Sequence, residues 1–272
     1  LDINEYGEIN LLYSKSNDAI LMNINGSNTT QSIIKSDLNL HSQLGMSFDG
    51  NELMQVSTSS FDGNNSTISL QRSLANNKNQ IGSVPISSIN SQWENSSSGD
   101  IYFADFNFDG YSDLVTSQPK VNTWTSSDQS NMGISNGEVN IFYGSLSGLS
   151  SIANLTYYGE QDNQELGQGV TVGDFNGDGF DDLVIGSPGY NLNSGKLDIY
   201  FGSGNGLITS PVLIQDVSTP SLPGDFYGFD LVTISDLDGD GIDELLVFSP
   251  LYEDGSNKGR IQLYHGASQI ND

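Results

Sequence analysis

The sequence contains no cysteine, and its eight lysines and arginines face 34 aspartates and glutamates. The missing cysteines exclude disulfides, thiolate metal sites and cysteine nucleophiles. With a formal net charge of −26, the chain lacks the basic surface that nucleic acids and anionic membranes require, so we expect neither as a partner. No apolar run approaches the roughly 18 residues of a membrane span, so we expect no membrane insertion. Metal cations are the partners that this charge favours.

Helical patterning is also missing, because no segment shows a convincing apolar period of 3.6 residues. The 31 glycines and many serines and asparagines indicate frequent turns. Short segments alternate between apolar and polar residues instead: Val139 and Ile141 alternate with Glu138 and Asn140, as in a half-buried strand. These features predict an all-β protein.

An internal repeat organises the chain, with a period of roughly 60–70 residues. Its first element is an acidic segment that runs into an apolar strand: DFNFDGYSDLVTSQP from Asp105, DFNGDGFDDLVIGSP from Asp174 and DLDGDGIDELLVFSP from Asp236. Its second element is a strand-like segment: GEVNIFYGS from Gly137, GKLDIYFGS from Gly195 and GRIQLYHGA from Gly259. Further apolar stretches at 154–159 and 211–216 give about four short strands per unit, which is typical of a propeller blade.

The acidic segments place oxygen-bearing side chains at positions one, three, five and nine, with a glycine at position six. Alternate spacing in a tight turn lets these side chains converge, and the carbonyl at position seven can join them. Hard oxygen donors suit calcium, and so many carboxylates would repel one another without a cation. We therefore expect three Ca²⁺ sites, with these ligands: Asp105, Asn107, Asp109, the Tyr111 carbonyl and Asp113; Asp174, Asn176, Asp178, the Phe180 carbonyl and Asp182; Asp236, Asp238, Asp240, the Ile242 carbonyl and Glu244.

An EF-hand is the first alternative for such loops, but it requires a glutamate at position twelve. That position holds Thr116, Ile185 and Val247 in the three loops, so the sequence excludes it. Metal-free polar turns are a second alternative, because Asp-Gly favours turns without any ion. A decayed copy at 44–56 keeps few acids, and we expect no metal there.

The whole pattern resembles the FG-GAP repeat of integrin α-subunit β-propellers and related bacterial repeats. The FG element corresponds to Leu166-Gly167 and Tyr227-Gly228, and the GAP element to 186–188 and 248–250. The resemblance implies blades of four antiparallel strands, structural calcium loops on one face and ligands on the opposite face. It is specific over 99–267 and weak over 1–98.

The resemblance also implies more blades than this chain holds. Four to five blades predict a fragment or a noncanonical ring, and another chain or domain could complete the propeller. The expected units are a partial N-terminal blade at 1–43, a degenerate blade without metal at 44–98, calcium blades at 99–165 and 166–225, and a calcium blade lacking its last strand at 226–272.

The favoured function is a calcium-stabilised extracellular or cell-surface module for recognition or adhesion, which binds a protein or carbohydrate ligand. Its expected contacts lie in three loops: 117–136 with Trp124, 187–195 with Tyr190, and 249–258 with Tyr252. We expect no enzyme, because the clustered acids are explained by calcium and no familiar catalytic motif is present. Two alternatives remain: a propeller-type enzyme such as a polysaccharide lyase or phospholipase, and an architectural domain of a large surface protein. His265, at the strand position of Tyr143 and Phe201, is expected to pack within a blade.

Overall fold

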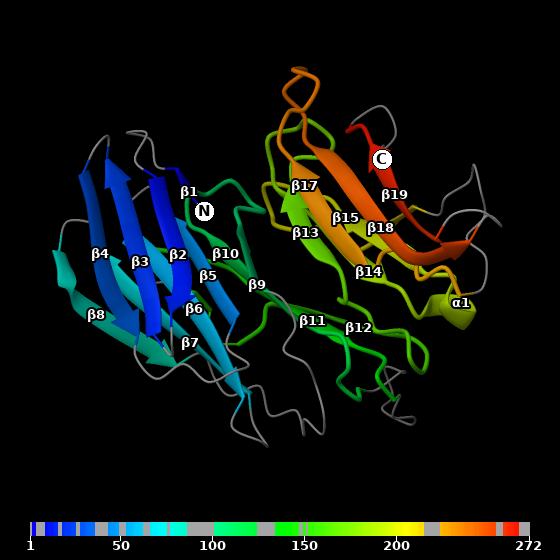
Figure 1. Ribbon diagram of the computed structural model, residues 1–272, viewed down its shortest axis with the longest axis horizontal. Helices are drawn as coiled ribbons and strands as arrows, with labels where there is room; N and C mark the ends of the chain where they lie inside the picture. Colours follow the sequence, from blue (N-terminus) through cyan, green and yellow to red (C-terminus); the bar gives the residue numbers. More distant parts are fainter. Residues whose placement is uncertain are drawn as a thin grey trace.

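The computed structural model consists of five sheets that follow one another along the chain, each with its strands in sequence order and antiparallel (Figure 1). The structure describes residues 101–123, 134–146, 149–150, 152–214, 224–253 and 258–266, without the side chains at 213, 214 and 258. In the N-terminal region it describes the backbone of the strands alone. The all-β prediction is confirmed, with one short helical turn, α1 (Tyr190–Asn193), in this part of the chain.

The first two sheets contain eight strands: β1 (Asp2–Ile3), β2 (Ile9–Lys15), β3 (Asp18–Asn25) and β4 (Asn28–Lys35); β5 (Gln43–Phe48), β6 (Leu53–Phe61), β7 (Ser66–Leu74) and β8 (Asn77–Pro85). The next two contain β9 (Ile101–Ala104), β10 (Asp113–Gln118), β11 (Glu138–Phe142) and β12 (Leu155–Tyr158); β13 (Val170–Gly173), β14 (Asp182–Ser187), β15 (Lys196–Tyr200) and β16 (Val212–Ile214). The last contains β17 (Asp230–Ile234), β18 (Glu244–Glu253) and β19 (Lys258–Tyr264).

The first strand of each sheet lies next to the first strands of its neighbours. β13 contacts β9 on one side and β17 on the other, and β9 also contacts β5. The later strands of each sheet extend outward from this inner row, as Figure 1 shows for β9–β19. The blade-like arrangement places equivalent loops of successive sheets beside one another.

Apolar side chains from adjacent sheets form the core. One cluster joins Val139 and Ile141 of β11 to Leu183 and Ile185 of β14. A second joins the next pair of sheets through β15, β18 and the residues around Tyr227. The prediction that the third strands are half-buried is wrong for β11 and β15, because all five residues of each are buried. A sheet between two others has no solvent face, so even polar Glu138 and Asn140 lie inside.

The FG and GAP elements form the junctions between sheets. Within one unit, the Gly167 N–H donates to the Gly186 carbonyl at 2.9 Å, which pairs the two elements. Tyr227 forms a backbone bridge with Gly195 of the preceding sheet. A Cβ on Gly195 would lie 2.1 Å from the Tyr227 carbonyl oxygen, so this close approach requires glycine.

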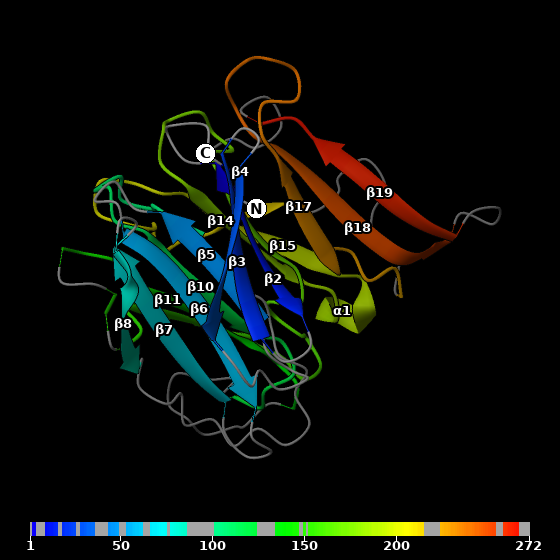
Figure 2. The same ribbon diagram turned by 60° about the vertical axis from the view of Figure 1, so that its left-hand side comes forward.

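Within the part of the chain that the structure describes, one face of the last sheet is left uncovered by any other sheet. Ile261 is 62% exposed and Leu263 is 39% exposed, whereas their counterparts Leu197 and Ile199 are fully buried against the following sheet. β17–β19 contains three strands, and it stands at the edge of the molecule in Figure 1 and again in Figure 2. The expected unit at 1–43 holds four strands, although β1 is only two residues long.

Candidate metal centre

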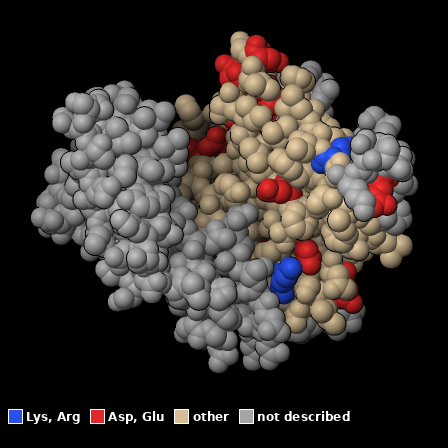
Figure 3. Space-filling view, viewed as in Figure 1, with Lys and Arg blue, Asp and Glu red and all other residues tan. Residues whose placement is uncertain are grey.

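The three acidic segments link the first two strands of the last three sheets. Each begins where β9, β13 or β17 ends and runs into the second strand, so all three lie at the same end of neighbouring sheets. Figure 3 shows acidic side chains gathered at this end, over the turn between β17 and β18. The expected ligands therefore fall into three adjacent loops.

In the second loop, the backbone folds around the carboxylate of Asp174. Its Oδ1 accepts hydrogen bonds from the N–H groups of Gly177 at 2.8 Å and Asp178 at 3.1 Å, and its Oδ2 accepts one from Gly179 at 2.9 Å. The Asp178 carboxylate in turn accepts the Phe180 N–H at 3.0 Å. Gly179 at position six has a φ of +87°, which permits the sharp bend that the spacing predicted.

The first loop repeats this geometry closely. Asp105 accepts the N–H groups of Asp109 at 3.1 Å and Gly110 at 2.9 Å, and Asp109 accepts that of Tyr111 at 2.9 Å. The amide of Asn107 donates to Asp109 at 3.1 Å, as that of its counterpart in the second loop does. Positions one, three and five are thus oriented together in both loops.

The third loop brings its acids closest together. Carboxylate oxygens of Asp236, Asp238 and Asp240 all lie within 4.8 Å of one another. The Gly241 N–H bonds to Asp236 at 2.8 Å, and the Ile242 N–H bonds to Asp240 at 2.9 Å. Three exposed carboxylates held this close repel one another, which lowers stability unless a cation lies between them.

The acids at position nine are held differently from the others. Asp182 is fully buried, and its two oxygens accept the N–H groups of Phe175 and Gly202, both at 2.9 Å. Asp113 does the same with Phe106 and Gly144. Each carboxylate thereby joins its loop to the end of the third strand. Burial raises the pKa of Asp113 to about 7 and that of Asp182 to about 8, although these hydrogen bonds act in the opposite direction.

Position eight carries a contact between loops that the sequence prediction missed. The Asp181 carboxylate accepts the Asp105 N–H of the preceding loop at 2.7 Å, and the Asp243 carboxylate accepts the Asp174 N–H at 3.1 Å. Burial is the main cause that raises the pKa of Asp181 and Asp243. The sequence signal is the first acid in FDDL and IDEL, which stands directly before the expected ligand and is not explained by it.

Apolar contacts also join the loops. The Phe180 ring meets the Phe108 ring of the preceding loop edge to face, with centroids 6.1 Å apart. The Ile242 side chain of the third loop packs against Gly177 of the second loop. A Cβ added to Gly177 would lie 2.8 Å from the Ile242 side chain. These contacts connect the loops into a row along one end of the sheets. We therefore expect a substitution in one loop to affect the stability of the next.

His265 differs from its counterparts at the end of the third strand. Tyr143 reaches the next unit, where its hydroxyl accepts the Leu207 N–H at 2.9 Å, and Phe201 is buried. The His265 side chain is 41% exposed, and its Nδ1 lies 3.2 Å from Asp238 Oδ2 in the acidic loop. Its expected packing within a blade is therefore replaced by a contact with the candidate metal centre.

The repeated sheets and acidic loops define a class of protein: a β-repeat protein whose units carry oxygen-rich loops of the kind that hold hard cations. Residues 166–206 match the family model described as FG-GAP repeat, so the chain contains an FG-GAP repeat. Among the described residues, no helix is long and apolar enough to cross a membrane.

Two curated relatives show how far the similarity extends. Integrin alpha-5 of Xenopus laevis is 32% identical over 101 residues, which cover 37% of this chain and 9% of that protein. Phosphatidylinositol-glycan-specific phospholipase D of Rattus norvegicus is 30% identical over 182 residues, which cover 62% of this chain and 20% of that protein. The matches thus span a fifth or less of these relatives, and the similarity to both is distant.

A solved structure of the exotype rhamnogalacturonan lyase YesX aligns with 85% of this chain and 47% of its own, at 11% identity and a TM-score of 0.47.

Proposed function

We propose that this chain is a calcium-stabilised module for recognition or adhesion, which binds a protein or carbohydrate ligand through the end opposite its acidic loops. The observation that carries the proposal is the row of three equivalent oxygen-rich loops, joined by the contacts of Asp181 and Asp243. Ions in such a row stiffen one end of three sheets and leave the other end free for a ligand.

The donor set fits calcium. The side chains at positions one, three and five are carboxylates and amides, which bind a metal ion through oxygen; oxygen ligands are those that Ca²⁺ prefers and that softer metals do not select. In the third loop the acids Asp236, Asp238 and Asp240 already surround a common point. Asp113 and Asp182 are buried carboxylates, and burial raises the pKa of each, to about 7 and about 8; a bound cation would act in the opposite direction and favour the ionised form. The ion would be held by the residues expected from the sequence, with position nine closing each loop.

Calcium sites of this kind favour an extracellular or cell-surface location. Calcium is abundant outside cells, where modules with dissociation constants of about 0.1–1 mM are filled. The chain's similarity to integrin alpha-5 is consistent with that location, although it covers only part of either chain.

The expected contact end contains an exposed apolar side chain in an unusual backbone. Asn191, Leu192 and Asn193 all have φ between +48° and +64°, and Leu192 is 77% exposed. Such backbone costs energy and is characteristic of functional loops. Tyr190 lies under Lys196 Nζ, 4.8 Å from its ring centroid, and Tyr252 lies 4.2 Å from Arg260 Cζ. Trp124, the third expected anchor, lies outside the described residues.

A binding screen with two matched variants tests the contact end. Leu192→Asp places a charge at the proposed contact end, whereas Leu146→Asp does so at the acidic-loop end, where Leu146 is equally exposed at 79%. For any protein or glycan that the wild-type chain retains, we expect Leu192→Asp to weaken binding at least tenfold and Leu146→Asp to leave it unchanged. The reverse result would place the ligand at the calcium end. A calcium-stabilised chain that retains no ligand would favour the architectural role.

The second candidate is an enzyme, and the similarity to phosphatidylinositol-glycan-specific phospholipase D favours it, because that match covers 62% of this chain. It covers only 20% of the relative, so the shared region need not include the part of that protein that performs catalysis. The test is whether the purified chain turns over a phosphatidylinositol glycan or a polysaccharide, and whether a substitution in the chain abolishes that activity. Both results together would contradict the recognition proposal and support an enzyme.

The uncovered face of the last sheet is proposed to receive a further blade-like sheet. Ile261 and Leu263 occupy the positions that Leu197 and Ile199 use to pack against the following sheet. The partner would come from another chain or domain and would complete the propeller. Ile261→Lys should abolish assembly with such a partner and leave the stability of this chain unchanged, because Ile261 is already exposed.

A further inference from the structure

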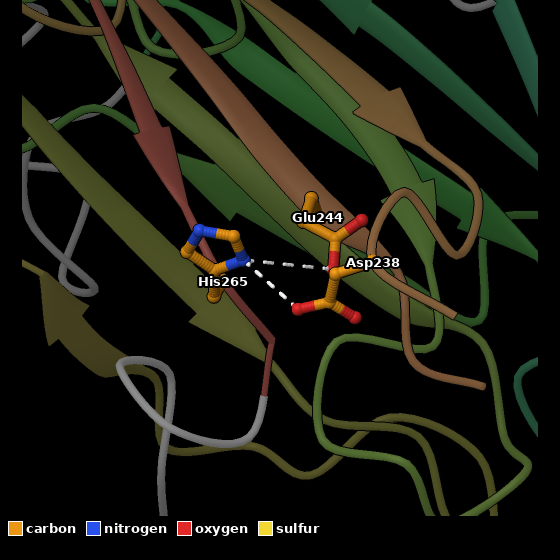
Figure 4. Close-up of side chains that lie close together, drawn as sticks. All are labelled: Asp238, Glu244 and His265. Carbon is orange, nitrogen blue, oxygen red and sulfur yellow. Dashed lines mark ion pairs between the residues drawn. The ribbon is translucent and has the colours of Figure 1, made fainter. Parts of the chain in front are cut away.

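Two of the positions at which the third unit differs from the other two face each other. Position nine is Glu244 where the other loops have Asp113 and Asp182. The end of the third strand is His265 where the other units have Tyr143 and Phe201. Figure 4 shows the imidazole with Nδ1 turned toward both Asp238 and Glu244. The two substitutions therefore change the same place in the molecule.

The longer side chain of Glu244 leaves one buried oxygen unsatisfied. In the first two loops, both oxygens of the position-nine carboxylate accept backbone N–H groups. Glu244 Oε2 keeps one such bond, from the Leu237 N–H at 2.6 Å. Oε1 accepts none from the described residues, although the Glu244 side chain is only 1% exposed. A buried carboxylate oxygen without a hydrogen bond is costly, so its position indicates a missing ligand.

The three side chains present one nitrogen and two oxygens to a common point. His265 Nδ1 lies 3.2 Å from Asp238 Oδ2 and 4.0 Å from Glu244 Oε1, and ligand atoms of all three lie within 4.8 Å of one another. Donors around a tetrahedral zinc ion at about 2.1 Å are about 3.4 Å apart. The two His265 separations need to change by less than about 1 Å to reach that geometry, and the separation between Asp238 and Glu244 by at most about 1.4 Å.

We propose that Asp238, Glu244 and His265 form a binding site for a transition-metal dication such as Zn²⁺, with an N,O ligand set that neither of the other loops offers. Imidazole nitrogen is a ligand of zinc, cobalt and related ions, whereas calcium takes oxygen. The site supplies three protein ligands and leaves the fourth position to water or to a group from a partner. The site shares Asp238 and Glu244 with the calcium ligands expected in the third loop, so the two ions compete there; calcium binding by the first two loops does not bear on this proposal.

Cobalt titration of the tag-free, chelator-treated chain tests the site, because Co²⁺ reports nitrogen ligation by its visible absorption. We expect one Co²⁺ per chain, displaced by Zn²⁺. His265→Phe installs the residue that the preceding unit carries as Phe201, so we expect the fold to be retained and the affinity for Co²⁺ to fall at least tenfold. His41 is the chain's other histidine, and His41→Gln serves as the control that leaves binding unchanged.

Two results would overturn the proposal: no Co²⁺ bound by the wild-type chain, or equal affinity in His265→Phe. Glu244→Asp provides a second test, since it restores the position-nine residue of the other loops and should also weaken Co²⁺ binding at least tenfold. Calcium titration of the same samples separates this site from the proposed function. Co²⁺ binding without calcium binding would support this site and contradict the calcium proposal, and calcium binding without Co²⁺ binding would do the opposite.

Discussion

Replacing Asp182 by asparagine should have opposite effects on stability in the absence and in the presence of calcium. The side chain is fully buried, and its two oxygens accept N–H groups from Phe175 and Gly202. Burial raises its pKa from 3.8 to about 8, so without a cation the folded chain binds a proton that the unfolded chain releases near pH 4. The stability that this proton provides is fully present below about pH 4 and is lost as the pH rises toward 8.

The expected size of the effect follows from the pKa. At 1.36 kcal/mol per pH unit, a rise from 3.8 to about 8 corresponds to about 6 kcal/mol for keeping Asp182 ionised in the folded chain above pH 8. Asparagine removes that cost but can accept only one of the two N–H groups well, which costs about 1–3 kcal/mol. Without metal and above pH 8, Asp182→Asn should therefore be more stable than the wild type by about 3–5 kcal/mol.

Calcium should reverse this order, because the ion compensates the charge of Asp182 and an amide binds it less strongly. Urea unfolding of both chains, in chelator and in millimolar calcium at about pH 5 and above pH 8, measures the difference. A variant that is less stable than the wild type by the same amount in chelator and in calcium would refute the reasoning. It would show that Asp182 is held by its hydrogen bonds alone.

Three further predictions concern contacts around the loops. Gly202→Ala should lower the free energy of unfolding by about 1–3 kcal/mol in urea titrations, because its Cβ would lie 2.3 Å from a backbone oxygen of the acidic loop. Asp243→Ala should lower it by about 1–2 kcal/mol by removing the acceptor of the Asp174 N–H, and a double-mutant cycle with a ligand of the second loop should show coupling. Leu197→Lys should abolish folding as judged by near-UV circular dichroism, whereas its counterpart Ile261→Lys should not, since the two are 0% and 62% exposed.

The sequence predicts the acidic loops well because their information is local. The positions of Asp174, Asp178 and Gly179 follow from the spacing, and the structure shows the turn that this spacing implies. The alternation in the third strands was misleading, because burial of Glu138 and Asn140 depends on the sheets that cover both faces. A single strand carries no information on its neighbours.

Long-range contacts account for the other differences. Asp181 bonds to Asp105, 76 positions earlier, so its role depends on how successive units are placed together. His265 looked like a core residue because Phe201 holds the same position, but its side chain stays 41% exposed among the described residues and lies beside an acidic loop. Both contacts depend on how segments distant in the sequence are arranged in space, which a local sequence pattern does not specify.

The central claim is that the acidic loops are structural calcium sites, and thermal unfolding followed by circular dichroism tests it most directly. One site filled at about 10 times its dissociation constant adds about 1.4 kcal/mol, which raises the midpoint by about 3–6 °C for a chain of this size. We expect millimolar calcium to raise the midpoint by at least this amount over chelator, and Asp178→Ala to remove part of the gain. An equal midpoint in calcium and in chelator would contradict the account and would leave the loops as polar turns.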